Sequence, residues 1–477
     1  LAGDAITTGD YNVALGMTTL STNTAANKNV AIGAQALADF NVTSDTDTYN
    51  VAVGYAAGAA VTTGTFNTLI GGLAGDANTT GERNTAVGQQ SFSTNTTGSY
   101  NTVLGRSALF SNTTAPNNTA VGYEALYANT TGTINTALGR QALANNTTGT
   151  DNTAVSYSLV TNTTGIQNTA VGVSALNANT TGSYNTAVGR EALKSNTTGT
   201  FNVAIGRTSL TTNTTGTNNV AMGYNALNAS TTGSYNVAIG NSSGSGITTG
   251  TQNVIVAANG GAITTGSNFT CLGYASMGGA VSTGSANTAV GYATLYEVTS
   301  GANNTALGAD AGRAASPSGS ITTSSNRIVL GNNSVSHAYI KVAWTVTSDA
   351  RDKTDFTPLD LGLDFVKELK PITYKWDMRS NYGDSEAEDY DLAAQTPDGT
   401  HKEDWLDIGF KAQEVEALEI AAGYNKDNKT NLISSYTEDG NSMGLKYEKF
   451  VPILVKAIQE QQTLIESLTD RITALEG

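Results

Sequence analysis

A serine and a lysine lie five residues apart in residues 347–353, which read Thr-Ser-Asp-Ala-Arg-Asp-Lys. The hydroxyl of Ser348 is a weak nucleophile on its own, but a lysine amine that has lost its proton can activate it as a general base. A lysine loses its proton more readily when it is removed from water or lies near another positive charge. Arg351 supplies such a charge, whereas three aspartates within residues 349–355 oppose it. Spacing alone therefore leaves Ser348 and Lys353 only as candidates for a catalytic pair.

This run lies where the composition of the chain changes. Residues 1–347 contain ten Lys/Arg and twelve Asp/Glu, whereas residues 348–477 contain fourteen and twenty-seven, so their net charges of −2 and −13 make up the total of −15. The first part lacks the clustered basic residues that phosphate contacts need, and we expect no nucleic-acid partner. Cys271 is the only cysteine, which excludes an intrachain disulfide, and we expect it in the core. No apolar run is long enough to cross a membrane.

A single motif repeats through the first part of the chain. The glycine of Asn-[Thr/Val]-Ala-[Val/Leu/Ile]-Gly recurs at a spacing that is mostly 17 residues. Ser156 and Ala257 replace this glycine in two repeats, and the step from Gly33 to Gly54 is longer. A period this short is too small for a helix pair or a propeller blade, and it fits one coil of a β-solenoid. The aligned glycines are Gly16, Gly33, Gly54, Gly71, Gly88, Gly105, Gly122, Gly139, Gly172, Gly189, Gly206, Gly223, Gly240, Gly273, Gly291 and Gly308.

Each repeat contains two short apolar runs separated by turn residues, as in residues 118–134, and each run has the length of a short strand. We expect the coils to stack through main-chain hydrogen bonds, with Val, Leu and Ile in an inner column and Asn and Thr in ladders. The glycine of Asn-Thr-Thr-Gly is expected to adopt a positive φ in the turn. About 18 coils at roughly 4.7 Å each would give residues 1–312 a length of roughly 85 Å. Recurring tyrosines fit packing between coils better than a ridge that binds sugars; they are Tyr49, Tyr100, Tyr184 and Tyr235.

The inner column is rich in alanine, so a single coil buries few large side chains. This favours the association of several chains side by side, and we expect a trimer. The period ends near residue 313, and residues 313–347 are expected to form a short β-stalk, with a strand over 338–346. Tyr339 and Trp344 in this stalk are candidates for receptor contact, although stalk core is the stronger interpretation.

The last part of the chain has helical periodicity. Apolar residues step by three and four along residues 450–476, which predicts a coiled coil. β-Branched residues at one seam position and leucine at the other favour a coiled coil of two helices. However, Gln461 and the shortness of the seam mean that the attached domain determines the oligomeric state. The trimer therefore remains our expectation. The seam residues are Val451, Leu454, Ile458, Gln461, Ile465, Leu468, Ile472 and Leu475. The predicted fold class is therefore an all-β repeat body, which we expect to be trimeric, followed by a smaller α+β domain that ends in a coiled-coil helix.

Residues 348–477 carry four motifs in order: Ser-Asp-x-Arg-x-Lys at 348–353, Lys-Pro-Ile-Thr-Tyr-Lys-Trp at 370–376, Ile-Gly-Phe-Lys-Ala-Gln-Glu-Val-Glu at 408–416, and Tyr-Glu-Lys-Phe-Val-Pro-Ile-Leu at 447–454. These motifs resemble the intramolecular chaperone domains of phage endosialidases, phage tail fibres and the myelin regulatory factor family. The resemblance implies a single-turnover autoprotease.

In that resemblance Ser348 is the nucleophile and Lys353 its general base, and the cleavage junction is Thr347, Ser348 and Asp349. Attack on the preceding carbonyl would cut before Ser348, whereas the family is also described as cleaving after it, so both bonds stay open. The Asn-Val-Ala-Ile-Gly units, as at 29–33, 202–206 and 236–240, resemble the head repeats of trimeric autotransporter adhesins. Those repeats form left-handed β-rolls and are typically shorter than 17 residues.

Together these observations predict the precursor of a homotrimeric phage tail fibre or tailspike shaft for host attachment. Its domains would be the solenoid shaft (1–312), the stalk and junction (313–347) and the chaperone autoprotease (348–477). The expected partners are two further copies of the chain, a host cell-surface receptor, and other virion tail proteins through a part preceding Leu1. A glycan is one candidate for the receptor. No cofactor, no metal and no membrane insertion are expected.

Two alternatives remain open. A bacterial trimeric surface adhesin would share the repeats, but it should carry a signal segment and a C-terminal anchor, and gene neighbourhood would distinguish it. A polysaccharide depolymerase tailspike would share the chaperone but should present paired carboxylates in a groove of the body. Acidic residues in 1–347 are scattered singly apart from near neighbours such as Asp45 and Asp47. A capsule-degradation assay would distinguish the depolymerase from the other two possibilities.

Overall fold

The structure is a computed structural model that describes residues 1–477 except 336, 342–345, 384–390 and 438–439. The chain forms two compact units. The first consists of Leu1–Ala293 and Thr299–Asn304, and the second consists of Thr294–Val298 and Thr305–Gly477. No helix among the described residues is both long and apolar enough to span a bilayer.

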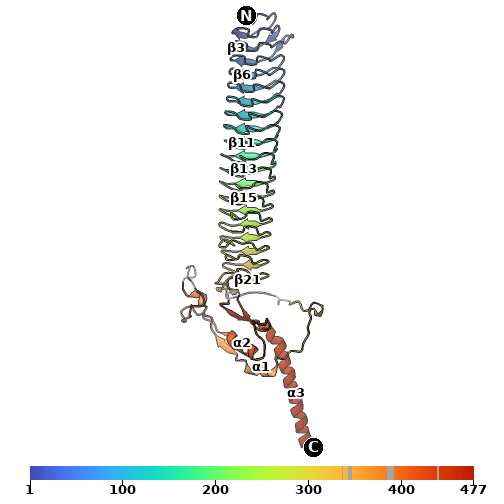
Figure 1. Cartoon of the computed structure of the whole chain (residues 1–477), viewed down its shortest axis with the longest axis vertical. Coiled ribbons are helices and arrows are strands. Elements are labelled where there is room, and N and C mark those ends of the chain that lie inside the picture. Colours follow the sequence, from blue (N-terminus) through green and yellow to red (C-terminus); the bar gives the residue numbers. More distant parts are fainter. Residues whose placement is uncertain (336, 342–345, 384–390, 438–439) are drawn as a thin grey trace. The chain divides into compact units, whose positions relative to one another are not determined.

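The first unit is a β-solenoid in which each coil contributes one three-residue strand to a parallel sheet (Figure 1). Equivalent residues of successive coils are register partners; Ala120 of one coil, for example, lies opposite Ala137 of the next. The sheet strands are β1 (Val13–Leu15), β3 (Val30–Ile32), β5 (Val51–Val53), β6 (Thr68–Ile70), β7 (Thr85–Val87), β8 (Thr102–Leu104), β9 (Thr119–Val121), β10 (Thr136–Leu138), β11 (Thr153–Val155), β12 (Thr169–Val171), β13 (Thr186–Val188), β14 (Val203–Ile205), β15 (Val220–Met222), β16 (Val237–Ile239), β17 (Val254–Val256), β18 (Thr270–Leu272) and β19 (Thr288–Val290). A separate parallel pair joins β2 (Ala26–Asn27) to β4 (Thr46–Asp47).

The interior of the solenoid is lined by alanine rather than by the larger aliphatic residues of each strand. Because side chains alternate along a strand, the middle residue points inward and its two neighbours point outward. In β9, Ala120 is fully buried, whereas Thr119 and Val121 are partly exposed. The predicted inner column of Val, Leu and Ile is therefore wrong for these strand positions. Leucine from the second apolar run, such as Leu126, completes the core.

This second run forms turns instead of the predicted second strand. Glu124 and Leu126 adopt left-handed backbone conformations with φ of 54° and 53°. Alternate left-handed residues curl the chain sharply, so the run closes the coil while its leucine still points inward. β-Sheet propensity could not predict this, since non-glycine residues rarely take positive φ.

Two glycines of each coil have different structural roles, and one of them differs from the prediction. Gly122, which ends a strand, has a φ of 134°, and a side chain there would place its Cβ 2.5 Å from the carbonyl oxygen of Gly139. Gly132, in Asn-Thr-Thr-Gly, does not have the predicted positive φ. It is needed for close approach, because a Cβ would lie 2.3 Å from the Gly149 carbonyl oxygen and 2.5 Å from Asn129 Oδ1.

Two ladders of buried asparagine side chains run along the solenoid, as predicted for the Asn positions. In one ladder, Asn118 Nδ2 donates to the Gly132 carbonyl at 3.0 Å, while Asn118 Oδ1 accepts from the backbone amide of Asn135 at 3.0 Å. In the other, the amide of Asn146 donates to Oδ1 of Asn129 at 2.8 Å. Each coil is thus joined to the next by side chains as well as by the main chain.

Two of the four recurring tyrosines, Tyr49 and Tyr184, stack on rings of the next coil, which confirms packing as their role. Tyr184 and Phe201 stack with centroids 4.7 Å apart and an interplanar angle of 4°. Tyr49 and Phe66 stack at 5.7 Å. Ring faces covered in this way are not available as platforms for sugars. Cys271 is fully buried, and burial raises the pKa of its thiol to about 12.

The second unit begins with a parallel pair, β20 (Thr305–Leu307) and β21 (Ile328–Leu330), and continues into an α+β domain. The predicted strand over 338–346 is not found among residues 337–341 and 346 that the structure describes, and Trp344 lies outside the described residues. Two antiparallel hairpins follow, β22 (Ile372–Tyr374) with β23 (Asp407–Gly409) and β24 (Ser434–Tyr436) with β25 (Met443–Leu445). The helices are α1 (Leu363–Glu368), α2 (Ala412–Ala421) and α3 (Phe450–Glu476), with 3-10 turns at η1 (Ala350–Asp352), η2 (Arg379–Asn381) and η3 (Tyr447–Lys449).

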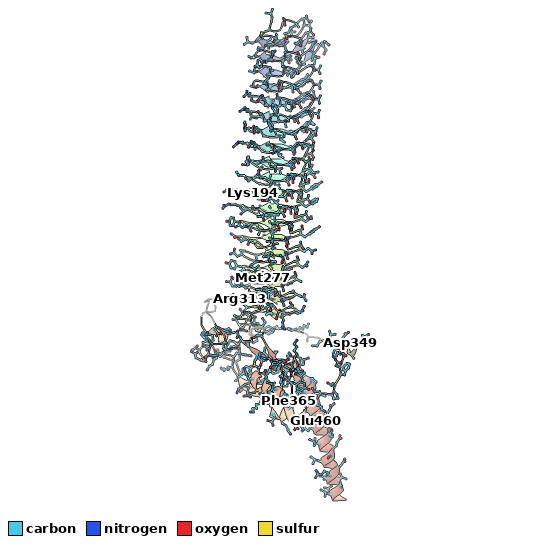
Figure 2. All side chains as sticks on the ribbon, viewed as in Figure 1. Lys194, Met277, Arg313, Asp349, Phe365 and Glu460 are labelled. Atoms are coloured by element: carbon cyan, nitrogen blue, oxygen red, sulfur yellow. The ribbon has the colours of Figure 1, made fainter. Side chains whose placement is uncertain are left out.

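The core of this domain joins α1, α2 and the first turns of α3. Phe365, labelled in Figure 2, lies in a cluster with residues from all three helices. The buried members are Leu361, Phe365, Val415, Ile433, Phe450 and Ile453. The structure thus confirms the predicted fold class of a β-solenoid body followed by a small α+β domain that ends in a helix.

Candidate functional site

The structure brings Ser348 and Lys353 into direct contact. Lys353 Nζ lies 2.5 Å from Ser348 Oγ and 3.4 Å from the Ser348 carbonyl oxygen. The short turn η1 makes this possible, because it folds the five-residue segment back on itself. Asp349 caps the turn by accepting a hydrogen bond from the Arg351 amide at 2.9 Å, and the Lys353 amide donates to the Ala350 carbonyl at 3.3 Å.

The positive charge of Arg351 does not act on Lys353 in the way that the sequence suggested. Its guanidinium forms an ion pair with Asp349, at 2.5 Å between Nη2 and Oδ2. The Arg351 side chain, together with its backbone amide, lowers the pKa of the Asp349 carboxyl. The positive charge of Arg351 is therefore directed at Asp349, and any environment that favours a neutral Lys353 must have another source.

Both members of the pair are exposed to solvent in the single chain. A hydroxyl with an amine at hydrogen-bond distance has the geometry of a nucleophile and its base. Water, however, stabilises the protonated form of an amine, whereas burial favours the neutral form that can accept a proton. In a single chain the serine hydroxyl and the lysine amine are in contact, but they are not shielded from water as the reaction requires.

Helix α3 is anchored at one end and exposes an apolar stripe along its length. Phe450, Ile453 and Ala457 are buried against the domain, which fixes the first two turns. The apolar residues of the predicted seam, on the other face of the helix, are between 44% and 87% exposed. These residues are Val451, Leu454, Ile458, Ile465, Leu468, Ile472 and Leu475. A helix with this stripe gains apolar burial only when another surface covers it.

The motifs at 408–416 and 447–454 meet in the fold. The Phe410 amide donates to the hydroxyl of Tyr447 at 3.2 Å, and the rings of Phe410 and Phe450 are 5.1 Å apart. A Cβ on Gly409 would lie 2.3 Å from the Tyr447 hydroxyl oxygen, so glycine is required for this contact. These two motifs therefore build the scaffold that carries α3.

Sequence reasoning missed two carboxylates that hold the domain together. Glu419, on α2, is fully buried and accepts hydrogen bonds from the amides of Leu432, Ile433 and Ser434 at 2.7, 2.6 and 2.9 Å. Glu419 follows Val415 by four residues, so the two side chains lie on the same face of the helix. This spacing was the sequence feature that could have indicated its burial.

The second missed carboxylate is Glu460 on α3. It accepts a hydrogen bond from the Leu363 amide at the start of α1, at 2.7 Å, across 97 residues of sequence. This contact, with the nearby Lys456, lowers the pKa of the Glu460 carboxyl. A Cβ on Gly362 would clash with the same carboxylate, so the glycine leaves room for it. No local pattern could have linked these residues.

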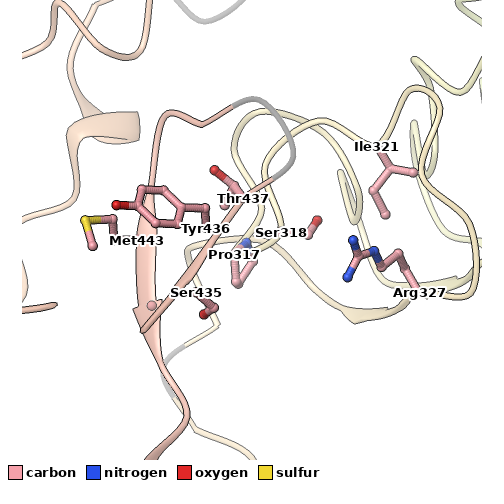
Figure 3. Close-up of a pocket in the computed structure, with 9 residues that line it drawn as sticks. Pro317, Ser318, Ile321, Arg327, Ser435, Tyr436, Thr437 and Met443 are labelled. Atoms are coloured by element: carbon pink, nitrogen blue, oxygen red, sulfur yellow. The ribbon is translucent and has the colours of Figure 1, made fainter. Parts of the chain in front are cut away.

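Two pockets lie within the second unit. One, of about 160 Å³, is lined by Arg327, by residues of the 317–321 loop and by the β24–β25 hairpin (Figure 3). The other, of about 210 Å³, lies between the end of α1 and α2 and includes Glu368, Lys411 and Glu414. Neither is lined by Ser348 or Lys353. Within the described residues, no three His, Cys, Asp or Glu side chains are grouped so as to hold a metal ion.

With this geometry in place, the C-terminal unit can be classed as an α+β domain that carries a Ser/Lys contact at its start and an exposed helix at its end. Residues 348–424 match the Peptidase S74 family, described as Chaperone of endosialidase. The match begins at Ser348 and spans the first three of the four sequence motifs, and it confirms their resemblance to this family. No curated protein matches the chain. The C-terminal unit therefore carries a chaperone domain of the endosialidase type, and together with the β-solenoid body this supports a tail-fibre-type protein.

Proposed function

We propose that this chain is the precursor of a homotrimeric phage tail fibre or tailspike shaft whose C-terminal domain assembles three chains and then cleaves itself off at Ser348. One observation carries the proposal: the endosialidase-chaperone match begins at the serine whose Oγ lies 2.5 Å from Lys353 Nζ. The same repeats would suit a bacterial surface adhesin, but the chaperone match favours the fibre.

The proposed reaction uses Ser348 as nucleophile and Lys353 as general base. Neutral Lys353 takes the proton of Oγ, and Oγ attacks a neighbouring carbonyl carbon. If that carbonyl belongs to Thr347, the acyl group moves from the Ser348 nitrogen to Oγ, the lysine returns the proton to the freed amine, and water hydrolyses the ester. Cleavage after Ser348 would leave this residue on the shaft, so the masses of the two fragments distinguish the bonds.

Assembly would supply the environment that one chain lacks. Because Ser348 and Lys353 are exposed, the lysine of an isolated chain is solvated by water. Neighbouring chains that cover the junction would desolvate the amine and favour its neutral form. Cleavage would then wait until three chains have met, which is the order that a folding template requires.

Two exposed apolar stripes support association. One is the seam of α3. The other lies on the solenoid, where the third residue of each strand points outward, as do Leu104, Leu138 and Ile205, and each is more than a third exposed. Covering a half-exposed leucine is worth about 1 kcal/mol, and the contribution recurs at every coil. Three solenoids in contact along this stripe would bury it.

A template is needed because the repeats do not define their own register. A shift of one whole coil between chains places nearly identical residues in the same contacts, so misaligned trimers cost almost nothing. A C-terminal domain that associates first would set the alignment. Its removal would leave the shaft without its folding route, which makes the product kinetically stable.

The proposed place of the mature rod is the virion tail, outside the cell, with attachment to the host as its role. Other proteins of the virion tail are further proposed partners. The direct test compares the intact masses and denaturing gels of the purified wild type, Ser348→Ala and Lys353→Met. Lys370→Met, which removes a lysine outside the junction, is the matched control. We expect fragments that split at Ser348 in wild type and control only, and an uncut wild-type trimer would refute self-release.

A further inference from the structure

A column of arginine and tyrosine side chains runs along the outside of the solenoid. It is formed by the residue that follows the glycine of each coil, and it is exposed throughout residues 106–224. The members in chain order are Arg106, Tyr123, Arg140, Tyr157, Val173, Arg190, Arg207 and Tyr224. Between residues 101 and 312 the chain has five Lys/Arg, and four of them are in this column. Such a concentration of the few positive charges on one line is not required by the coil, which tolerates Tyr and Val at the same position.

Main-chain hydrogen bonds keep the column in register. The amide of Glu124 donates to the Arg106 carbonyl at 3.1 Å, and the same bond joins Thr208 to the Arg190 carbonyl at 2.9 Å. Coils rise by about 4.8 Å, so the six coil steps from Arg106 to Arg207 span roughly 29 Å. The column therefore holds its four arginines in register, separated along the chain by two, three and one coil steps.

Most of these guanidinium groups have no carboxylate partner. Across the described residues, no ion pair is formed by Arg106, Arg140 or Arg207, whereas Arg190 pairs with Glu191 at 3.3 Å. Glu191 also lies 3.8 Å from Lys194, the solenoid lysine labelled in Figure 2.

The other acidic residue beside the column is Glu124, whose carboxylate already accepts hydrogen bonds from neighbouring side chains. The amide of Gln141 donates to its carboxylate at 2.8 Å, and the hydroxyl of Tyr123 is a second donor. These bonds and the nearby guanidinium groups of Arg106 and Arg140 lower the pKa of Glu124. Its negative charge therefore offsets part of the column, while within the described residues only Arg190 of the four column arginines donates to a carboxylate.

Tyrosines hold the guanidinium planes in place. Arg106 lies over the ring of Tyr123 at 5.9 Å, and Arg207 lies over the ring of Tyr224 at 5.7 Å. A guanidinium stacked on a ring still presents its N–H edges outward, where carboxylate or phosphate oxygens bind in two-pronged fashion. The hydroxyls of Tyr157 and Tyr224 add donors that can bind sugar hydroxyls.

We propose that this column binds an extended anionic polysaccharide, with its acidic groups on the arginines and its sugar units along the tyrosines. A polymer suits the geometry because it can contact several coils at once, and each weak exposed contact then adds to one binding event. The inference rests on the proposed function, in which the rod attaches to a host surface. It adds the site and the chemical class of the receptor.

The test measures binding of the full-length protein to polygalacturonate and to a polyglycerol-phosphate polymer, with neutral dextran of similar length as reference. A triple variant, Arg106→Gln/Arg140→Gln/Arg207→Gln, removes three charges from the column. The control Lys28→Gln/Arg83→Gln/Lys194→Gln removes three charges from other faces of the same solenoid. We expect the wild type and the control to bind at least one anionic polymer, and the column variant to bind it roughly tenfold more weakly.

Three results would overturn the proposal: no binding of either anionic polymer at low salt, equal losses in the two triple variants, or equal binding of dextran. A change in oligomeric state confined to the column variant would instead assign the column to contacts between chains. Fragment masses measured on the same samples report self-cleavage independently, so a failure of the binding site is distinguishable from a failure of the proposed function.

Discussion

Replacing Ser230 with asparagine should stabilise the solenoid. In the second asparagine ladder, Asn213 donates to Asn196 Oδ1 at 2.8 Å and to the Gly216 carbonyl at 3.1 Å. The next position in this ladder is Ser230, whose side chain is too short to continue it. Among the described atoms, Asn213 Oδ1 and Ser230 Oγ are consequently buried without a hydrogen-bond partner.

The size of the effect follows from these two orphaned groups. A buried acceptor without a partner costs about 1–3 kcal/mol, and an ordinary hydrogen bond contributes about 1 kcal/mol net. An asparagine at position 230 would donate to Asn213 Oδ1 and to the Gly233 carbonyl, repeating the geometry of the earlier coils. Ile247 follows in the same column and cannot extend the ladder, so Oδ1 of the introduced asparagine replaces Asn213 Oδ1 as the unpaired end of the ladder, and on balance one orphaned group is removed. We expect a net stabilisation of about 1–2 kcal/mol.

The unfolding rate of the assembled protein in guanidinium, followed by circular dichroism, measures this gain, since long repeat assemblies seldom unfold reversibly. A stabilisation of this size would slow unfolding by roughly 5- to 30-fold if the ladder is intact in the native state and broken in the transition state. Asn213→Ser is the matched control, because it shortens the ladder by one coil and should accelerate unfolding. An unchanged or faster rate for Ser230→Asn, with a native spectrum, would refute the assignment of the ladder as a source of stability.

Three further predictions concern other parts of the chain. Gly122→Ala should destabilise the solenoid by several kcal/mol, because the residue has a φ of 134° and its Cβ would lie 2.5 Å from the Gly139 carbonyl oxygen; native-like unfolding of this variant would contradict the role of that glycine. Glu460→Gln should remove a pH-dependent part of the stability of the C-terminal domain. The folded pKa of Glu460 is lowered, so its contribution to stability is present above its ordinary pKa of 4.5 and is lost as the pH falls through the folded pKa. A wild type and variant with parallel stability profiles below pH 4.5 would contradict the contact with Leu363. Cys271, with a thiol pKa of about 12 and full burial, should react with iodoacetamide only after unfolding, and rapid labelling of the native protein at pH 8 would contradict its position in the core.

The period of the chain and the C-terminal motifs were enough to predict both parts of the fold. A 17-residue repeat with asparagine and glycine at the same positions in each repeat is too short for most repeat folds and predicts one coil of a solenoid. The four motifs in order predicted the chaperone domain. The direction of the strand side chains was predicted wrongly, because the pattern does not say which of two alternating sets points inward. The narrow coil admits alanines such as Ala120 and turns Val121 outward.

What the sequence could not predict depends on neighbouring coils or on distant segments. The positive φ of Leu126 contradicts local preference and is held by hydrogen bonds to the next coil. Gly132 is needed for an approach between coils and not for a turn of its own. The Ser348 and Lys353 contact was predictable because it is local, whereas Glu460 reaches Leu363 across 97 residues.

The central claim is that assembly precedes and permits self-release. The most direct measurement is the fraction cleaved at Ser348 in a chain that cannot associate through α3, compared with the wild type at equal concentration. Ile458→Asp/Ile465→Asp/Leu468→Asp places charges in the exposed seam without touching the buried residues of the helix. Gln462→Asp/Glu466→Ala, elsewhere on the same exposed helix, is the control. The account predicts monomers that stay uncut for the seam variant and cleaved trimers for wild type and control; a seam variant that remains monomeric and still cleaves fully would contradict it.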